Sequence, residues 1–193
     1  AGEKFALHLL PVGVLSPNKM AAIGTGVALD LPRMLEEIQA LGARGIHVGD
    51  SLRISDRAQL VMPYHKRQDQ LSEAALGNAK IGTTARGIGP CYADKMLRST
   101  ALRAGDLLRP DEFREKLTRI VELKNRLFAA LYDDREPMDA SAMADEYLAC
   151  GERVRAYWWR DDPVAAAPLW RRPAERLAAG DRRLTEGSDL VVS

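Results

Sequence analysis

The sequence is poor in cysteine, in net charge and in long apolar runs. Its two cysteines, Cys91 and Cys150, are too few for a disulfide framework or a cysteine-only metal site, and they fit a reducing compartment. The formal net charge of +1 gives no long-range attraction to nucleic acids or membranes. No apolar run approaches the roughly 18 residues that span a bilayer, and no signal peptide is visible. We therefore expect a cytoplasmic protein with neither nucleic acid nor membrane as a partner.

Apolar residues at helical spacing predict three helices. The chain of 193 residues is 46% hydrophobic, enough for one domain with a sizeable core or for a piece of a larger one. The first predicted helix follows Asp30 as N-cap and stops at Gly42. The second starts near Pro110, and the third runs roughly from Asp139 to Tyr157. The apolar stripe of the second helix is expected to comprise Phe113, Leu117, Ile120, Leu127, Phe128 and Leu131.

Shorter apolar segments predict strands between these helices. Alternation predicts a strand over residues 5–9, and extended segments are expected over 21–30, 52–56 and 58–65, with a further helix over 67–77. Strands that alternate with helices predict an α/β fold. Because the sequence starts inside a strand and without Met, we expect a fragment of a longer protein. The tail 158–193 has poor apolar periodicity, and we expect it to be aberrant or poorly ordered, with 1–157 as the main segment.

The segment "KIGTTARGIGPCYADK", Lys80–Lys95, is the strongest candidate for a binding site. Its glycines are expected to prevent a regular helix or strand, and backbone N–H groups in such a loop can converge on an anion. Thr83 and Thr84 add hydroxyl groups, and Arg86 adds a planar guanidinium that suits phosphate. The segment is neither a Walker A loop nor a Rossmann fingerprint. Composition alone leaves a tight structural loop equally open.

The remaining polar residues form no constellation that predicts catalysis or metal binding. The histidines have no partner at metal-ligand spacing and are more typical of structural or surface positions, although His65 lies near a predicted helix start. Helix and turn capping accounts for three isolated carboxylates, Asp50, Asp56 and Asp94. The cations after the glycine segment fit a phosphate site or a solvated face; they are Lys95, Arg98 and Arg103.

Several long motifs, in order, resemble the adenylosuccinate synthetase family. "IGTTARGIGPCYADK" followed by "LRAGDL" is similar to the family signature. "GEKFALHLLPVGVL", "IGTGVALDLPRMLEEIQALGARGI" and "SLRISDRAQLVMPYH" extend the resemblance from about Gly2 to about Tyr157. The sequence departs from the family at Ala85, where glycine is usual, and by one extra residue in "RSTALRAGDL". If that glycine requires a positive φ, we expect alanine to cost on the order of 1 kcal/mol.

The resemblance implies an activity and a set of ligands. Members condense IMP with L-aspartate, using GTP and Mg²⁺; GTP phosphorylates the purine 6-oxygen and aspartate displaces that phosphate. The implied fold is a single large α/β domain with a mostly parallel central sheet flanked by helices, and the implied assembly is a homodimer. Thr84 would bind the IMP phosphate, Arg98 would reach the IMP phosphate in the other subunit's site, and Arg86 would assist at the substrate end.

The family motifs that carry catalysis are not found in these residues. The G-D-E-G-K-G-K segment supplies the catalytic base and magnesium ligand, and G-x-N-A-G-H supplies a catalytic histidine. The sequence has "LTEGSDL" near the place of F-E-G-A-Q-G, with Asp189 where glutamine would fall. We therefore predict no catalytic residue and no metal ligand, and expect this chain alone, a truncated or frame-disrupted copy, to be inactive. The alternatives are a non-catalytic remnant, a dimerisation or IMP-binding module, or a phosphate-binding protein of another class.

Overall fold

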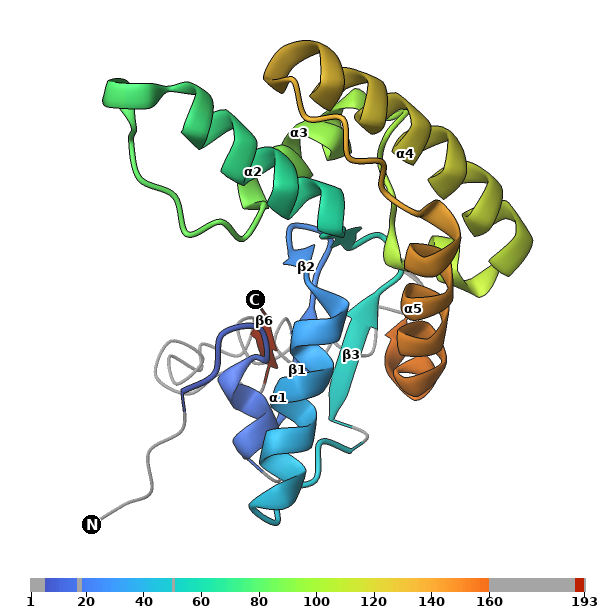
Figure 1. The fold of residues 1–193 in the computed structure, drawn as a ribbon. Coiled ribbons are helices and arrows are strands. Elements are labelled where there is room, and N and C mark those ends of the chain that lie inside the picture. Colours follow the sequence, from blue (N-terminus) through green and yellow to red (C-terminus); the bar gives the residue numbers. More distant parts are fainter. Residues whose placement is uncertain (1–5, 17–18, 50, 160–189, 193) are drawn as a thin grey trace, which may run out of the picture. The chain divides into compact units, whose positions relative to one another are not determined.

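The computed structural model describes residues 6–16, 19–49, 51–159 and 190–192. The chain divides into two compact units (Figure 1). The first unit comprises residues 1–27, 33–58 and 154–193, and the second comprises residues 28–32 and 59–153. Each unit is described by itself below.

A parallel sheet forms the centre of the first unit. Its strands are β1 (Met20–Ile23), β3 (Leu52–Ser55), β5 (Trp158–Trp159) and β6 (Leu190–Val192), in the order β5-β3-β1-β6. Every neighbouring pair is parallel, and Ala21 lies opposite Leu52 on one side and Val191 on the other. Ile23, Leu52 and Ile54 are fully buried, as expected for parallel strands covered on both faces. The predicted α/β class with parallel pairing is confirmed.

Helix α1 (Leu31–Ala43) confirms the prediction made from apolar spacing. It begins directly after Asp30, and its first two residues belong to the second unit. The side chains that repeat every three or four residues are buried, namely Leu31, Met34, Leu35 and Leu41. The helix continues past the expected stop at Gly42, and the left-handed residue that follows it is Gly45, with φ of 77°.

The strand predicted over residues 5–9 is wrong for the described residues of this segment. The N–H groups of His8, Leu9 and Leu10 all donate to the carboxylate of Glu37 on α1, at 3.0–3.1 Å. A strand sends successive N–H groups to opposite sides, so three neighbouring N–H groups cannot meet one carboxylate in that conformation. A short 3₁₀ helix, η1 (Val12–Leu15), follows.

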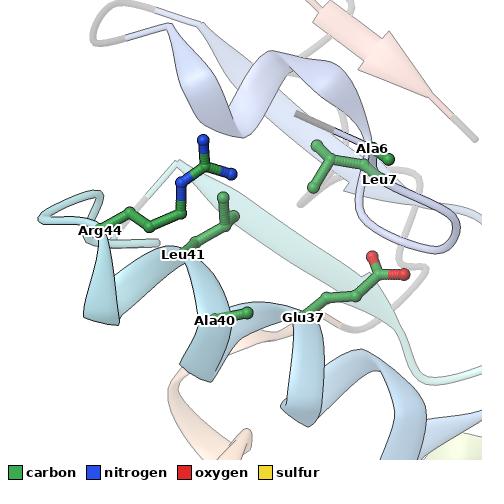
Figure 2. A pocket seen from close by; sticks show the side chains of 6 residues that line it. All are labelled: Ala6, Leu7, Glu37, Ala40, Leu41 and Arg44. Carbon is green, nitrogen blue, oxygen red and sulfur yellow. The ribbon is translucent and has the colours of Figure 1, made fainter. Parts of the chain in front are cut away.

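A small pocket lies between this N-terminal segment and α1 (Figure 2). Ala6 and Leu7 line one side, α1 supplies Glu37 and Leu41, and Arg44 directly follows α1. The Glu37 carboxylate already accepts the three backbone hydrogen bonds, so it stabilises the N-terminal segment of the chain itself. We assign no ligand to this pocket.

The strand predicted over residues 21–30 is divided into two strands of different sheets. Val27 N–H donates to Gly24 O at 3.2 Å and closes a turn after β1. The chain then enters β2 (Ala28–Leu29) in the second unit, which pairs in parallel with β4 (Gln59–Leu60). The glycines of "IGTG" thus mark a turn rather than the interior of a strand.

Helices dominate the second unit. They are α2 (Pro63–Ala75), α3 (Ile88–Leu97), α4 (Pro110–Tyr132) and α5 (Ala140–Arg153), with short 3₁₀ helices η2 (Gly77–Ala79) and η3 (Ala104–Leu108). Helix α2 packs against α3 and α4, and α4 packs against α5. Asp139 caps α5 by accepting the N–H groups of Ser141 and Ala142 at 2.8 and 3.1 Å. The 3₁₀ helix η4 (Arg155–Tyr157) returns to the first unit.

Helix α2 begins earlier than the sequence patterns predicted, and helix α3 was not predicted at all. Helix α2 starts at Pro63 rather than near residue 67, because proline needs no hydrogen-bond partner in a first turn. Helix α3 starts at Ile88, so the expectation that glycines keep all of Lys80–Lys95 out of a helix is wrong for its second half. Pro90 falls in the first turn of α3, where its missing N–H costs nothing.

The predicted apolar stripe of α4 is correct at four of its six positions. Phe113, Leu117, Ile120 and Phe128 are buried, whereas Leu127 and Leu131 are 39% and 67% exposed. Lys124 occupies the buried stripe instead, because its ammonium group has a buried carboxylate partner in α3.

The prediction of an aberrant tail falls mainly on residues 160–189, which lie outside the described residues, so it stays a prediction. Within the described part of the chain, no helix has the length and apolar character to cross a membrane.

Candidate functional site

The segment between α2 and α3 is a wide open loop (Figure 1) whose ends and middle are tied to α2. Asp69 of α2 accepts the Thr83 hydroxyl at 2.9 Å with one oxygen and the Gly87 N–H at 2.9 Å with the other. The Thr83 hydroxyl oxygen in turn accepts the Ala85 N–H at 3.1 Å. One carboxylate therefore sets the path of the loop on both sides of residue 84.

The candidate ligand-binding groups lie between these anchors. Glu73 of α2 accepts the Gly82 N–H at 2.6 Å and fixes the start of the loop. Thr84 and Arg86 are exposed, and neither makes a hydrogen bond or ion pair to any other residue that the structure describes. The loop thus has fixed neighbours and two unengaged polar side chains, an arrangement that suits binding of an external anion.

Ala85 occupies a backbone conformation that favours glycine. Its φ is 54°, in the left-handed region, which confirms the expectation attached to this departure from the family motif. A side chain in this region costs about 1–2 kcal/mol. The loop retains its path despite this cost because the hydrogen bonds of Thr83 and Gly87 hold it on both sides.

Gly87 joins the loop to α3 at a point of very close backbone approach. Its φ is 72°, and a Cβ atom there would lie 2.6 Å from the carbonyl carbon of His65 and 2.6 Å from the nitrogen of Lys66. Both atoms belong to the backbone of α2 and cannot rotate away. Glycine is therefore required both for its conformation and for its lack of a side chain.

A buried polar network fixes α3 against α2 and α4. His65 Nδ1 accepts the Met62 N–H at 2.9 Å, so the proton lies on Nε2, which donates to Asp94 at 3.0 Å. Lys124 of α4 donates to the other oxygen of Asp94 and to Gln68, both at 2.9 Å. Asp94 and Lys124 are 1% and 4% exposed, so the ion pair is shielded from water.

In this network Asp94 is an anion, Lys124 is a cation and the His65 ring is neutral. Burial lowers the pKa of His65, and the nearby Asp94 only partly opposes this. Burial alone would raise the pKa of Asp94, but hydrogen bonds from His65 and Lys124 outweigh it and lower that pKa below its ordinary value. Asp94 is thus ionised, and the interpretation of Asp94 as a capping residue is wrong.

Cys91, on α3, is a structural residue. Its Sγ donates to Leu60 O at 3.4 Å, and it belongs to an apolar cluster with Ala28 and Val61. Burial, followed by the charge of Asp94, raises the pKa of the thiol to about 12. A thiol in this state is not a nucleophile near neutral pH.

The cations that follow the loop differ in how far they are engaged. The Lys95 ammonium lies 5.7 Å from the centre of the Tyr92 ring, and both Lys95 and Arg103 are half-buried. Arg98 directly follows α3, is exposed, and has a φ of 58°. Of the three, Arg98 is the most available to a ligand.

Comparison with known proteins agrees with the family resemblance of the sequence as a whole. A family model described as adenylosuccinate synthetase matches residues 1–173. The chain belongs to the adenylosuccinate synthetase family. A relative named adenylosuccinate synthetase from Heliobacterium modesticaldum is 48% identical over 156 residues, and one from Lactococcus lactis subsp. cremoris (strain MG1363) is 44% identical over 191 residues.

The chain corresponds to only part of these relatives. The two alignments cover 81% and 99% of this chain but 36% and 42% of the relatives' own lengths. The solved structure of a fully ligated adenylosuccinate synthetase from Plasmodium falciparum matches with a TM-score of 0.72 at 24% identity, over 98% of this chain and 40% of that one. This structural likeness shows the shared fold.

The structure brings two of the three expected binding residues into one loop. Thr84 and Arg86 lie close together in the chain and are both exposed. Arg98 lies at the far end of the ten-residue helix α3. Sequence reasoning missed the network of His65, Asp94 and Lys124; the one signal was the position of His65 near a helix start. Among the described residues, no three side chains of the ligating types converge to hold a metal ion.

We predict that Gly87→Ala destabilises the chain by about 2–5 kcal/mol, because it adds left-handed strain and overlap with the α2 backbone. Gly89→Ala is the matched control, since nothing lies within 4 Å of its Cβ position. The control should change the unfolding free energy by less than about 1 kcal/mol. Urea denaturation measures both values, and equal effects of the two substitutions would contradict the packing described.

We predict that the chain loses stability as the pH falls from 7.5 to 5. The unfolded chain binds a proton on His65 near its ordinary pKa of about 6.5, whereas the folded chain resists protonation because its pKa is lowered. Stability is therefore complete above about pH 6.5 and declines below it.

The substitution His65→Gln tests whether His65 causes this loss of stability at low pH. Glutamine can accept the Met62 N–H and donate to Asp94, but it does not titrate. The urea midpoint of this variant should fall less between pH 7.5 and 5 than that of the unchanged chain. An equal fall in both would show that the histidine network is not its source.

Proposed function

We propose that residues 80–98 form the IMP phosphate-binding part of an adenylosuccinate synthetase. The whole enzyme would join IMP to L-aspartate in purine biosynthesis, with GTP as phosphoryl donor and Mg²⁺ as cofactor. The observation that carries the proposal is the state of Thr84 and Arg86, which are exposed and unengaged between anchored residues in the segment that matches the family signature.

The chemistry of the loop suits a phosphate monoester. The Thr84 hydroxyl donates one hydrogen bond, and the Arg86 guanidinium donates two in parallel to an anionic group. Asp69 and Glu73 lie under the loop, and each directs a carboxylate oxygen to a loop N–H group. Their charges oppose an anion, so the cations Arg86 and Lys80 and a further cation from outside the loop would be needed to offset them.

Arg98 is proposed to supply that further cation to a second copy of the chain. Support comes from the outer face of α3, where Ile88, Tyr92, Met96 and Leu97 are 39–74% exposed. Apolar faces of this kind are typical of protein interfaces. Arg98 follows this face directly, so pairing of two copies through α3 would bring it near the partner. We accordingly propose a homodimer.

The proposal assigns binding, and not turnover, to these 193 residues by themselves. The family motifs for the catalytic base, the catalytic histidine and the magnesium ligand are not among them. GTP, L-aspartate and Mg²⁺ therefore belong to the proposed whole enzyme, and so does the cytoplasmic setting. The exposed face of α3 also favours a second candidate, a dimerisation and IMP-binding module without catalysis.

We predict that Thr84→Ala weakens IMP binding about ten- to a hundredfold, because one hydrogen bond to an anion is lost. Thr84→Ser retains the hydroxyl and should bind IMP within about twofold of the unchanged chain. Isothermal titration calorimetry measures all three affinities. Unchanged IMP affinity in the alanine variant, with the fold intact by circular dichroism, would contradict the proposal.

A further inference from the structure

The end of α3 has an unusual turn centred on Arg98. The Ser99 N–H donates to Leu97 O at 2.5 Å, two residues back, and Arg98 has φ of 58° and ψ of −46°. This combination is close to the γ-turn with positive φ, which is rare and strained. The Ser99 hydroxyl donates to the same Leu97 oxygen at 3.2 Å, so one residue closes the turn twice.

The turn arises because the chain has no glycine with which to end the helix. Many helices end with a glycine in a left-handed conformation, but residues 90–104 contain none. Arg98 is the first residue after Leu97, and it takes the positive φ itself. An arginine there carries backbone strain that a glycine would relieve.

The turn at residues 98 and 99 lies between two parts of the chain that are held in place. Before the turn, Asp94 is fixed by its buried bonds to His65 and Lys124. After the turn the chain is buried at once, with exposed fractions of 4%, 5% and 0% for Thr100, Ala101 and Leu102. The segment "RSTALRAGDL", where the sequence departs from the family pattern by one extra residue, contains this exposed turn at Arg98 and Ser99.

We propose that Ser99 is a positioning residue, which closes a strained turn so that the Arg98 guanidinium is presented to the phosphate held by a second copy of the chain. The inference rests on the proposed function of Arg98 and adds the residue that orients it. Strain at this point is retained because the position needs a guanidinium and glycine has none. Because the turn already restricts the backbone at Arg98, less conformational entropy is lost when Arg98 binds the phosphate.

Two substitutions of Arg98 separate strain from binding. Arg98→Ala and Arg98→Gly both remove the guanidinium, and each should weaken IMP binding about ten- to a hundredfold. Only glycine relieves the positive φ, so Arg98→Gly should melt about 2–4 °C above Arg98→Ala. A melting temperature of Arg98→Gly equal to or below that of Arg98→Ala would contradict the presence of strain in this turn.

Substitution of Ser99 tests the positioning role. Ser99→Pro removes the N–H group and drives Arg98 toward an extended conformation, so it should lose nearly as much IMP affinity as Arg98→Ala. Ser99→Ala removes only the hydroxyl bond and should lose about two- to tenfold. In the Arg98→Ala background neither substitution should have any further effect, because the residue being positioned is absent.

The outcomes distinguish this inference from the proposed function. If Arg98→Ala binds IMP normally, the role of Arg98 is wrong and the inference fails with it. If Arg98→Ala weakens binding but the Ser99 variants cause the same loss with and without Arg98, then Ser99 is merely structural. Loss of binding by the Ser99 variants only when Arg98 is present supports the inference.

Discussion

The buried ion pair between Asp94 and Lys124 is the interaction on which the geometry of the candidate site depends. It joins α3 to α4, and the neutral His65 ring joins the same carboxylate to α2. Removing two charges from water is costly, and such a pair is tolerated only where further hydrogen bonds complete it. Here His65 and Gln68 provide them. Loss of one partner would leave an uncompensated charge among three packed helices.

The loop inherits its position from this helical frame. Gly87 lies against the backbone of α2 at the level of His65, and Asp69 holds the loop from the next turn of the same helix. The three packed helices therefore determine the position of Thr84, although the buried network makes no contact with that residue. Arg98, one turn beyond Asp94, is fixed from the other end of α3. Thr84 and Arg98 depend on one buried network, although they are proposed to serve two different copies of the chain.

Patterns in the sequence predicted those features of the structure that depend on residues close together in the chain. The spacing of apolar residues located α1, α4 and α5, and a glycine preference at position 85 appeared as a positive φ. The misses arose where a distant partner changes the outcome. Glu37 draws three N–H groups away from a predicted strand, and Asp94 draws Lys124 into an apolar stripe from 30 residues away. Such partners have no fixed spacing, so a single sequence does not reveal them.

The central claim is that this loop recognises the phosphate of IMP. Calorimetric titration of the 193-residue chain with IMP and with inosine, which has the same base and sugar but no phosphate, tests it most directly. The account predicts saturable binding of IMP and binding of inosine that is weaker by at least about tenfold, since charge-assisted hydrogen bonds to the phosphate are lost. Equal affinities for the two compounds, or no binding of IMP by the folded chain, would contradict it.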